Sequence, residues 1–231
     1  MKRYVGAIGV AAAWFATLHE LGRRWGATNE ELSRQMPGDD IVSHPKGRTT
    51  HGITIQAPPQ EIWPWIVQMG YHRGGWYTYH WVDRYLWHID NPSTDRIVSE
   101  LQDVSVGSVI PDGEPGTAFY VVERIERPNV LVLHSTTHVP PGLRDRISVD
   151  WTWAFELRET APGTTRLTLR VRATYAPPWV GAVFHGVIVP SDFVMTRSML
   201  RGIQRRAEGR LSRGDLRDAG RRRMVLEEVV G

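Results

Sequence analysis

Two neighbouring segments in the second half of this 231-residue chain alternate apolar and polar residues, and this alternation limits the possible folds more than any other feature. In residues 148–159 an apolar side chain stands at every odd position from Val149 to Leu157. Residues 165–175 alternate in the same way, and the turn signal Ala161-Pro162-Gly163 separates the two segments. A period of two is typical of β-strands. We therefore predict an antiparallel hairpin that is covered on one face only.

Four more segments have the composition of strands, and two others predict helices. Further strands are expected at 50–57, 108–111, 117–127 and 129–136. A helix should follow Pro58-Pro59, because proline is tolerated in a first helical turn. A longer helix is expected from Pro190 to about Leu211, with Phe193 and Leu200 on its apolar stripe. From alternation and order alone, the fold class is α+β with an antiparallel sheet.

Three stretches within residues 49–211 resemble those of a known superfamily. They are Ile53–Trp63 (ITIQAPPQEIW), Trp151–Leu157 (WTWAFEL) and the helix from Asp192. In this order they resemble the SRPBCC superfamily, which includes the START, birch-pollen-allergen and polyketide cyclase/dehydrase families. The segments W-P-W-x-V-Q-M-G and G-G-W-Y-T-Y look most like those of uncharacterised actinobacterial-type members.

The resemblance implies a helix-grip fold, in which a seven-stranded curved antiparallel sheet wraps around a long C-terminal helix. It also implies a hydrophobic cavity between the sheet and that helix. Most members of the superfamily bind apolar molecules such as lipids or polyketides, and some catalyse cyclisation or dehydration. An aromatic insertion at residues 71–91 departs from the simple pattern.

The chain divides into four parts. Residues 1–27 are expected to form a hydrophobic N-terminal helix, and residues 28–48 a short helix, opened by the capping box Thr28–Glu31, and a linker. The helix-grip domain spans 49–211, and an arginine-rich charged tail spans 212–231. The apolar run at residues 4–18 is open to three interpretations: a membrane anchor, a cleaved signal, or a helix packed on the domain. We expect a cytoplasmic protein, with attachment to the membrane through this run as an option.

The aromatic residues suggest where a ligand would bind, because large rings with polar tips are typical of cavities for flat or greasy molecules. Gly74-Gly75 precedes a short predicted helix, from Tyr77 to Leu86, that could cover such a cavity. The alternative is that these rings pack only as core. The predicted ligand-binding residues are Trp65, Trp76, Tyr77, Tyr79, His80, Trp81, Tyr85, His134, Trp151, Trp153, Phe193 and Leu200.

Recognisable catalytic and metal-binding patterns are scarce. The chain has no cysteine, which excludes thiolate zinc sites and cysteine nucleophiles. His134 and His138, four apart, should point the same way, but no third ligand stands at a suitable spacing, so no metal site and no cofactor are expected. His80 and Asp83 could act as an acid–base pair.

Three functions remain open at this point. The first is non-catalytic binding of a small hydrophobic ligand; the second is a cyclase or dehydratase that uses His80, Asp83, Tyr79 or His134. The third is an interaction module whose cavity is filled by tryptophan.

The segment from Arg197 to Arg223 contains ten arginines and three acidic residues. This excess of positive charge suggests an anionic membrane surface as a partner, with nucleic acid disfavoured. The sequence does not predict an oligomeric state.

Overall fold

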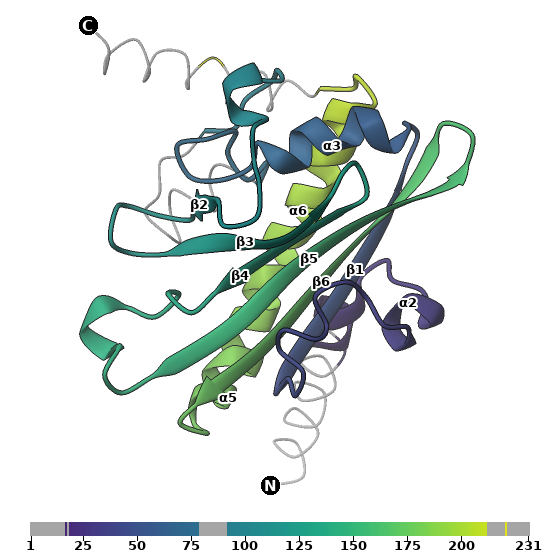
Figure 1. Ribbon diagram of the computed structural model, residues 1–231. Helices are drawn as coiled ribbons and strands as arrows, with labels where there is room; N and C mark the ends of the chain where they lie inside the picture. The colour runs from purple at the N-terminus through teal and green to yellow at the C-terminus, as the bar shows by residue number, and fades with distance from the viewer. Residues whose placement is uncertain (1–16, 18, 79–91, 212–219, 221–231) are drawn as a thin grey trace, which may run out of the picture.

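The core of the fold is one curved sheet of six antiparallel strands in the order β1-β6-β5-β4-β3-β2 (Figure 1). The computed structural model describes residues 17, 19–78, 92–211 and 220. The strands are β1 (Gly47–Ile55), β2 (Val109–Pro111), β3 (Phe119–Glu126), β4 (Val130–Ser135), β5 (Ser148–Ala161) and β6 (Thr164–Ala176). The predicted hairpin is confirmed, since β5 and β6 pair from Ser148↔Ala176 to Ala161↔Thr164. Six strands stand in the described residues where the resemblance implied seven.

A long helical run lies across the inner face of the sheet, which confirms the helix-grip arrangement (Figure 1). It consists of α5 (Val180–Val183), a π-helical segment (Phe184–Ile188) and α6 (Val189–Ala207). Two 3-10 turns lie in loops at Ser99–Leu101 and Pro141–Leu143. Helix α3 (Pro59–Val67), which the Pro58-Pro59 signal predicted, packs against α6 at one end of the sheet.

The predicted bounds of the long helix were wrong at both ends. The run begins ten residues before Pro190, because the wider π-helical turn just before this proline accommodates a residue without an N–H. It ends at Ala207 instead of Leu211. There Gly209 adopts a φ of 66°, and the N–H groups of Gly209 and Arg210 bond to the carbonyls of Arg206 and Arg205. This is a Schellman motif, which ends a helix.

The outer face of the sheet is also covered, which corrects the prediction that the strands are buried on one side only. Residues 28–46, here called the strap, cross this face before the chain enters β1. Helix α2 (Asn29–Ser33) opens the strap, and the predicted capping box is present: the Glu31 N–H donates to the Thr28 hydroxyl and the Thr28 N–H donates to the Glu31 carboxylate. Ile41 packs on an outer apolar cluster whose members are Val130, Val132 and Ala154.

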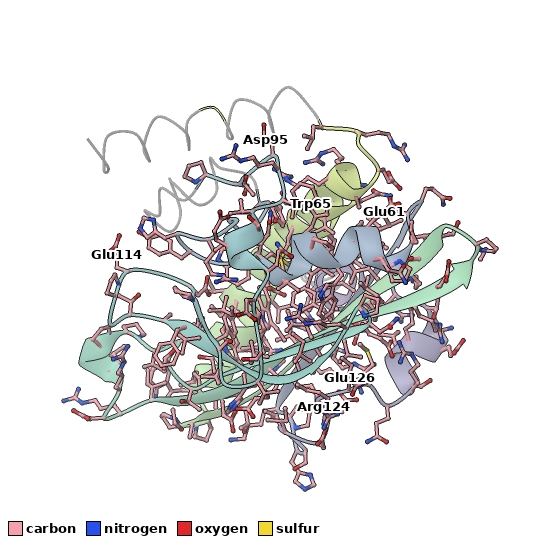
Figure 2. The ribbon with its side chains drawn as sticks, turned by 45° about the horizontal axis from the view of Figure 1, so that its top comes forward. Glu61, Trp65, Asp95, Glu114, Arg124 and Glu126 are labelled. Carbon is pink, nitrogen blue, oxygen red and sulfur yellow. The ribbon has the colours of Figure 1, made fainter. Side chains whose placement is uncertain are left out.

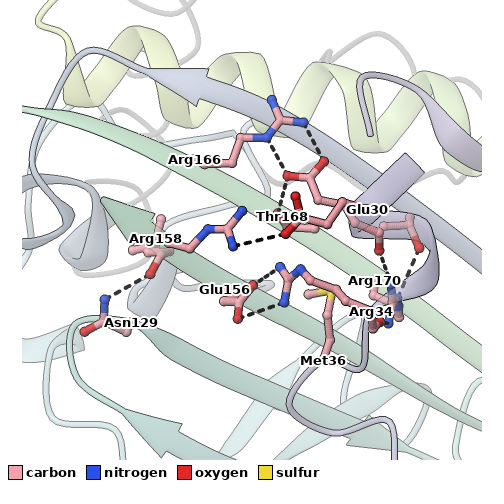
Figure 3. Close-up of polar contacts among 12 residues, drawn as sticks. Glu30, Arg34, Met36, Asn129, Glu156, Arg158, Arg166, Thr168 and Arg170 are labelled. Atoms are coloured by element: carbon pink, nitrogen blue, oxygen red, sulfur yellow. Dashed lines mark hydrogen bonds and ion pairs between the residues drawn. The ribbon is translucent and has the colours of Figure 1, made fainter. Parts of the chain in front are cut away.

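Buried ion pairs fasten the strap to the outer face (Figure 3). Arg170 on β6 is 1% exposed and its Nη1 lies 2.7 Å from Asp39 Oδ2. Arg166 Nε lies 2.7 Å from Glu31 Oε1, and Arg34 pairs with Glu156 on β5. The arginines that alternate along β6 therefore point to the strap rather than to water. A run of alternating charges on a strand does not by itself show that the charged face is solvated.

Residues 19–26 pack on the domain, beside β1 and α6. The Nε2–H of His51, on β1, donates to the Gly22 carbonyl at 2.6 Å, and the Gly52 N–H donates to the Trp25 carbonyl at 3.2 Å. A Cβ at Gly22 would lie 3.4 Å from Phe193 on α6. These contacts hold residues 19–26 on the domain. Apart from Thr17, the apolar run 4–18 lies outside the described residues, and none of the described helices has the length and apolar character that a membrane span requires.

A glycine of α6, Gly202, allows the backbone at Tyr77, within the aromatic insertion, to approach this helix closely. A Cβ at Gly202 would lie 2.5 Å from the Tyr77 carbonyl oxygen and 2.6 Å from Tyr77 Cβ. In a free helix Gly→Ala would stabilise by about 1 kcal/mol, but overpacking against backbone costs about 1–3 kcal/mol. We expect Gly202→Ala to lower the free energy of unfolding, measured in urea. Gly186→Ala, in the same helical run with open space around its Cβ, should be neutral or stabilising. Equal effects of the two variants would contradict the prediction.

Candidate ligand cavity

A cavity of about 370 Å³ lies between the inner face of the sheet and the long helical run. Strands β3, β5 and β6 form one wall, the residues from Phe184 to Met199 form another, and the loop at 137–141 closes one end. Trp76, Trp151 and Trp153, three of the predicted ligand-binding residues, line it. The volume is within the usual range for ligand pockets, at its small end. The tryptophans therefore line the cavity and leave it open. The interaction-module hypothesis required that they fill it.

An aromatic cluster makes most of the sheet-side wall. Tyr120 lies at its centre, with ring centroids 5.4 Å from Trp153, 6.1 Å from Trp76 and 4.6 Å from His138. Trp151 is stacked on Tyr120 at 6.4 Å with an interplanar angle of 11°. The indole nitrogens of Trp76 and Trp151 have no accessible surface. These two tryptophans therefore offer carbon surface to the cavity instead of hydrogen-bond donors.

His138 faces the cavity, but both of its ring nitrogens already have partners. Nδ1 lies 2.7 Å from Ser135 Oγ, and Nε2 lies 2.8 Å from Asp112 Oδ2. The three residue types are those of a serine hydrolase triad, but Ser135 does not line the cavity and its hydroxyl lies 2.6 Å from the Phe119 carbonyl. Without a free imidazole nitrogen or an exposed hydroxyl, the Asp112–His138–Ser135 chain acts to hold the wall together.

Two polar side chains of the cavity are left with bonding capacity. The Tyr120 hydroxyl has no hydrogen-bond partner in the part of the chain that the structure describes, although the residue is 1% exposed. Burial, together with the charges of Asp112 and Asp192, raises the pKa of Tyr120, so its hydroxyl stays protonated. Asp192, on α6, accepts one hydrogen bond, from Thr196 Oγ1 at 3.1 Å.

His51, on β1, is fully buried and interacts electrostatically with Asp192. Burial lowers the pKa of His51 and raises the pKa of Asp192. The electrostatic interaction between the two groups opposes both of these shifts. Because a carbonyl can only accept, the bond to Gly22 assigns the proton of the neutral imidazole to Nε2. Its Nδ1 has no hydrogen-bond partner among the residues that the structure describes. The neutral imidazole therefore provides no counter-charge for Asp192.

The other predicted site residues lie elsewhere. Trp65 lies on α3 (Figure 2) and is 8% exposed. It belongs to the core with Tyr77 and Leu200. The Tyr77 hydroxyl donates to the Trp65 carbonyl at 3.0 Å. Phe193 packs beside Gly22 on the N-terminal side of α6. None of these four residues lines the cavity.

His134 points away from the cavity, because it occupies an even position of the β4–β5 register, opposite Thr152. On this outer face it lies 2.7 Å from Asp150 and 3.4 Å from Glu123. The prediction that His134 and His138 point the same way was wrong, since β4 ends at Ser135 and the chain turns before His138. No group of three metal-binding side chains occurs within the described ranges.

The aromatic insertion is described only in part. Tyr79, His80, Trp81 and Tyr85, with Asp83, lie outside the described residues. Tyr77, where the short helix was predicted to begin, is not helical and has a φ of 59°. Gly74-Gly75, which precedes the predicted helix, lies in a tight turn. There Gly75 exchanges hydrogen bonds with Gly70 at 3.1 and 3.4 Å.

Sequence reasoning missed the polar side of the cavity: Tyr120, Asp112, His138 and Asp192. Tyr120 follows the alternation of its strand, since it shares a face with Val122. Asp192 stands four residues before Thr196, which lies three residues after Phe193 and four before Leu200, the two residues placed on the apolar stripe of the long helix. Residues four apart share a helix face. The spacing was therefore sufficient to place Asp192 toward the sheet.

Comparison with known proteins finds solved structures of low sequence identity. No family model matches the chain, and neither does any curated protein. Similar solved structures include CalU16 from Micromonospora echinospora, with 18% identity over 70% of this chain and 84% of that one, and a TM-score of 0.34. A norcoclaurine synthase variant from Thalictrum flavum has 10% identity over 72% and 96%, with a TM-score of 0.42. The Aha1 protein of Colwellia psychrerythraea has 14% identity over 72% and 99%, with a TM-score of 0.39. At such values these structures assign neither a family nor an activity to this chain.

Proposed function

We propose that this protein binds a small, mostly apolar ligand in the cavity between the sheet and α6, without catalysing a reaction. The observation that carries the proposal is the cavity of about 370 Å³ beside the cluster of Trp76, Tyr120, Trp151 and Trp153. Aromatic and aliphatic walls with few polar groups are typical of ligand sites. A lipid or polyketide of matching size is the chemical class that the fold suggests.

The arrangement of the polar groups favours binding over catalysis. A general base needs a nitrogen or carboxylate within reach of the substrate, and both nitrogens of His138 are engaged. Tyr120 and Asp192 remain, and they suit orientation of a bound molecule through hydrogen bonds. In the alternative function, a cyclase or dehydratase, Asp192 is the lining carboxylate that would serve as the general base.

A substitution that fills the cavity tests the proposal. Ala118 lines the cavity at its rim, and we expect Ala118→Trp to abolish binding of the neutral fluorescent probe N-phenylnaphthylamine. The reason is that the indole would occupy the space that the probe needs. The measurement is a fluorescence titration of the full chain, with circular dichroism to confirm folding. Ala182→Trp, on the exposed side of α5, is the matched control and should bind like the parent protein.

The two tryptophan variants separate specific from general binding. If both bind the probe as the parent does, the probe lies elsewhere and the cavity is not the site. Failure of the parent protein to bind any apolar probe would refute the proposed function. Native mass spectrometry of protein purified gently from its host would identify a co-purified ligand directly.

A further inference from the structure

The charge of the cavity lining is one-sided, and this bears on the ligand that the cavity accepts. The described residues that line it include two carboxylates, Asp112 and Asp192, and no lysine or arginine. Asp112 pairs with His138 at 2.8 Å. Among the described residues, the Thr196 hydroxyl is the one hydrogen-bond donor to Asp192. Of the charged groups in the described lining, Asp192 is the one that forms no ion pair with another described residue.

Several features limit what can bind beside Asp192. A carboxylate ligand would meet a like charge in an apolar surrounding, where repulsion is stronger than in water. A purely apolar ligand would cover the carboxylate without replacing its water, which is unfavourable. A protonated amine would donate hydrogen bonds to the carboxylate and compensate its charge. The neighbouring aromatic rings also attract cations.

We propose that the cavity selects ligands in which an apolar, one- or two-ring body carries a protonated amine, with the ammonium group on Asp192. The inference rests on the proposed function. The aromatic wall of Trp151 and Trp153 would hold the body, and the Tyr120 hydroxyl, which has no partner in the described residues, would accept or donate one further hydrogen bond. Fatty acids, by contrast, would be excluded by charge.

Three indole compounds of nearly equal size test the inference: tryptamine, tryptophol and indoleacetic acid. They carry an ammonium, a hydroxyl and a carboxylate on the same body. We expect isothermal titration calorimetry with the full chain at neutral pH to show that tryptamine binds at least about tenfold tighter than tryptophol, and indoleacetate more weakly than either. The Asp192→Asn variant should bring the ratio of tryptamine to tryptophol affinity close to one.

Two further variants complete the test. Asp145→Asn removes the same charge from an exposed loop position and should keep the parent ratio, which controls for net charge. If Asp192→Asn fails to fold, Asp192→Ala takes its place, since removal of a buried carboxylate also removes its desolvation cost.

The outcomes separate this inference from the proposed function. The inference is overturned if the three compounds bind equally, or if tryptamine keeps its advantage in Asp192→Asn. In either case the proposed function stands as long as tryptophol binds to the parent protein and Ala118→Trp blocks that binding. The inference is also overturned if no indole compound binds while N-phenylnaphthylamine does. If no probe binds in a manner sensitive to Ala118→Trp, both fail together.

Discussion

Replacement of Arg170 by alanine is expected to lower the free energy of unfolding by about 3–5 kcal/mol, measured by urea denaturation with circular dichroism. The guanidinium is 1% exposed and donates to Asp39, to the Thr50 hydroxyl, and to the carbonyls of Arg34 and Glu31. Alanine would leave a buried carboxylate short of its main partner and two carbonyls without a donor. The large effect follows from these unpaired groups rather than from the intrinsic strength of the ion pair.

A matched control and a double variant separate these causes. Arg158, on the neighbouring strand, is 49% exposed and lies 3.7 Å from Glu30, so Arg158→Ala should change the free energy of unfolding by less than about 0.5 kcal/mol. Arg170→Met combined with Asp39→Leu removes both charges. We expect this double variant to be more stable than Arg170→Met alone, because no buried charge then lacks a partner. An Arg170→Ala protein as stable as Arg158→Ala would show that the strap is not anchored through this residue.

The sheet and its long helix were predictable because local patterns determine them. The alternation in β5 and β6, with the Ala161-Pro162-Gly163 turn between them, specifies both the pairing and the inner face. The strap was not predictable in the same way. Arg170 reads as exposed from its strand alone, and its burial depends on Asp39, which is 131 residues away in the sequence. Long-range pairing of this kind has no periodicity.

The apolar side of the site was predicted from the sequence, whereas its polar side was missed and was predictable only in part. Trp151 and Trp153 line the cavity because they lie on the inner face of β5. His138 could not be placed from sequence, since its direction depends on where β4 ends. Asp192 was taken only as the start of a helix. Its position in the middle of a longer helical run depends on the π-helical turn before Pro190, which no local signal predicts.

The second large effect should appear as a pH dependence of stability, through Glu31 on the strap. Burial alone would raise the pKa of Glu31, but the hydrogen bonds from Arg166, the Thr28 N–H and Thr168, with the charge of Arg166, outweigh it and hold the pKa at about 2. Because the folded pKa is below the ordinary 4.5, ionised Glu31 stabilises the folded state at pH 5 and above. This contribution falls as the pH drops from about 5 and is lost near pH 2. At about 1.4 kcal/mol per pKa unit, it amounts to roughly 3 kcal/mol at neutral pH.

Urea denaturation of Glu31→Gln and of the parent protein at several pH values from 7 to 3 measures this contribution. At pH 7 we expect the variant to be less stable by roughly 2–3 kcal/mol, and the difference between the two proteins should shrink as the pH is lowered. Glu30→Gln is the control: Glu30 adjoins Glu31 in α2 but is 70% exposed and lies 3.7 Å from Arg158. Its substitution should have little effect at any pH, because solvent screens exposed pairs. A Glu31→Gln difference that stayed constant from pH 7 to 3 would mean that shape and packing, and not the charge of Glu31, hold the strap in place.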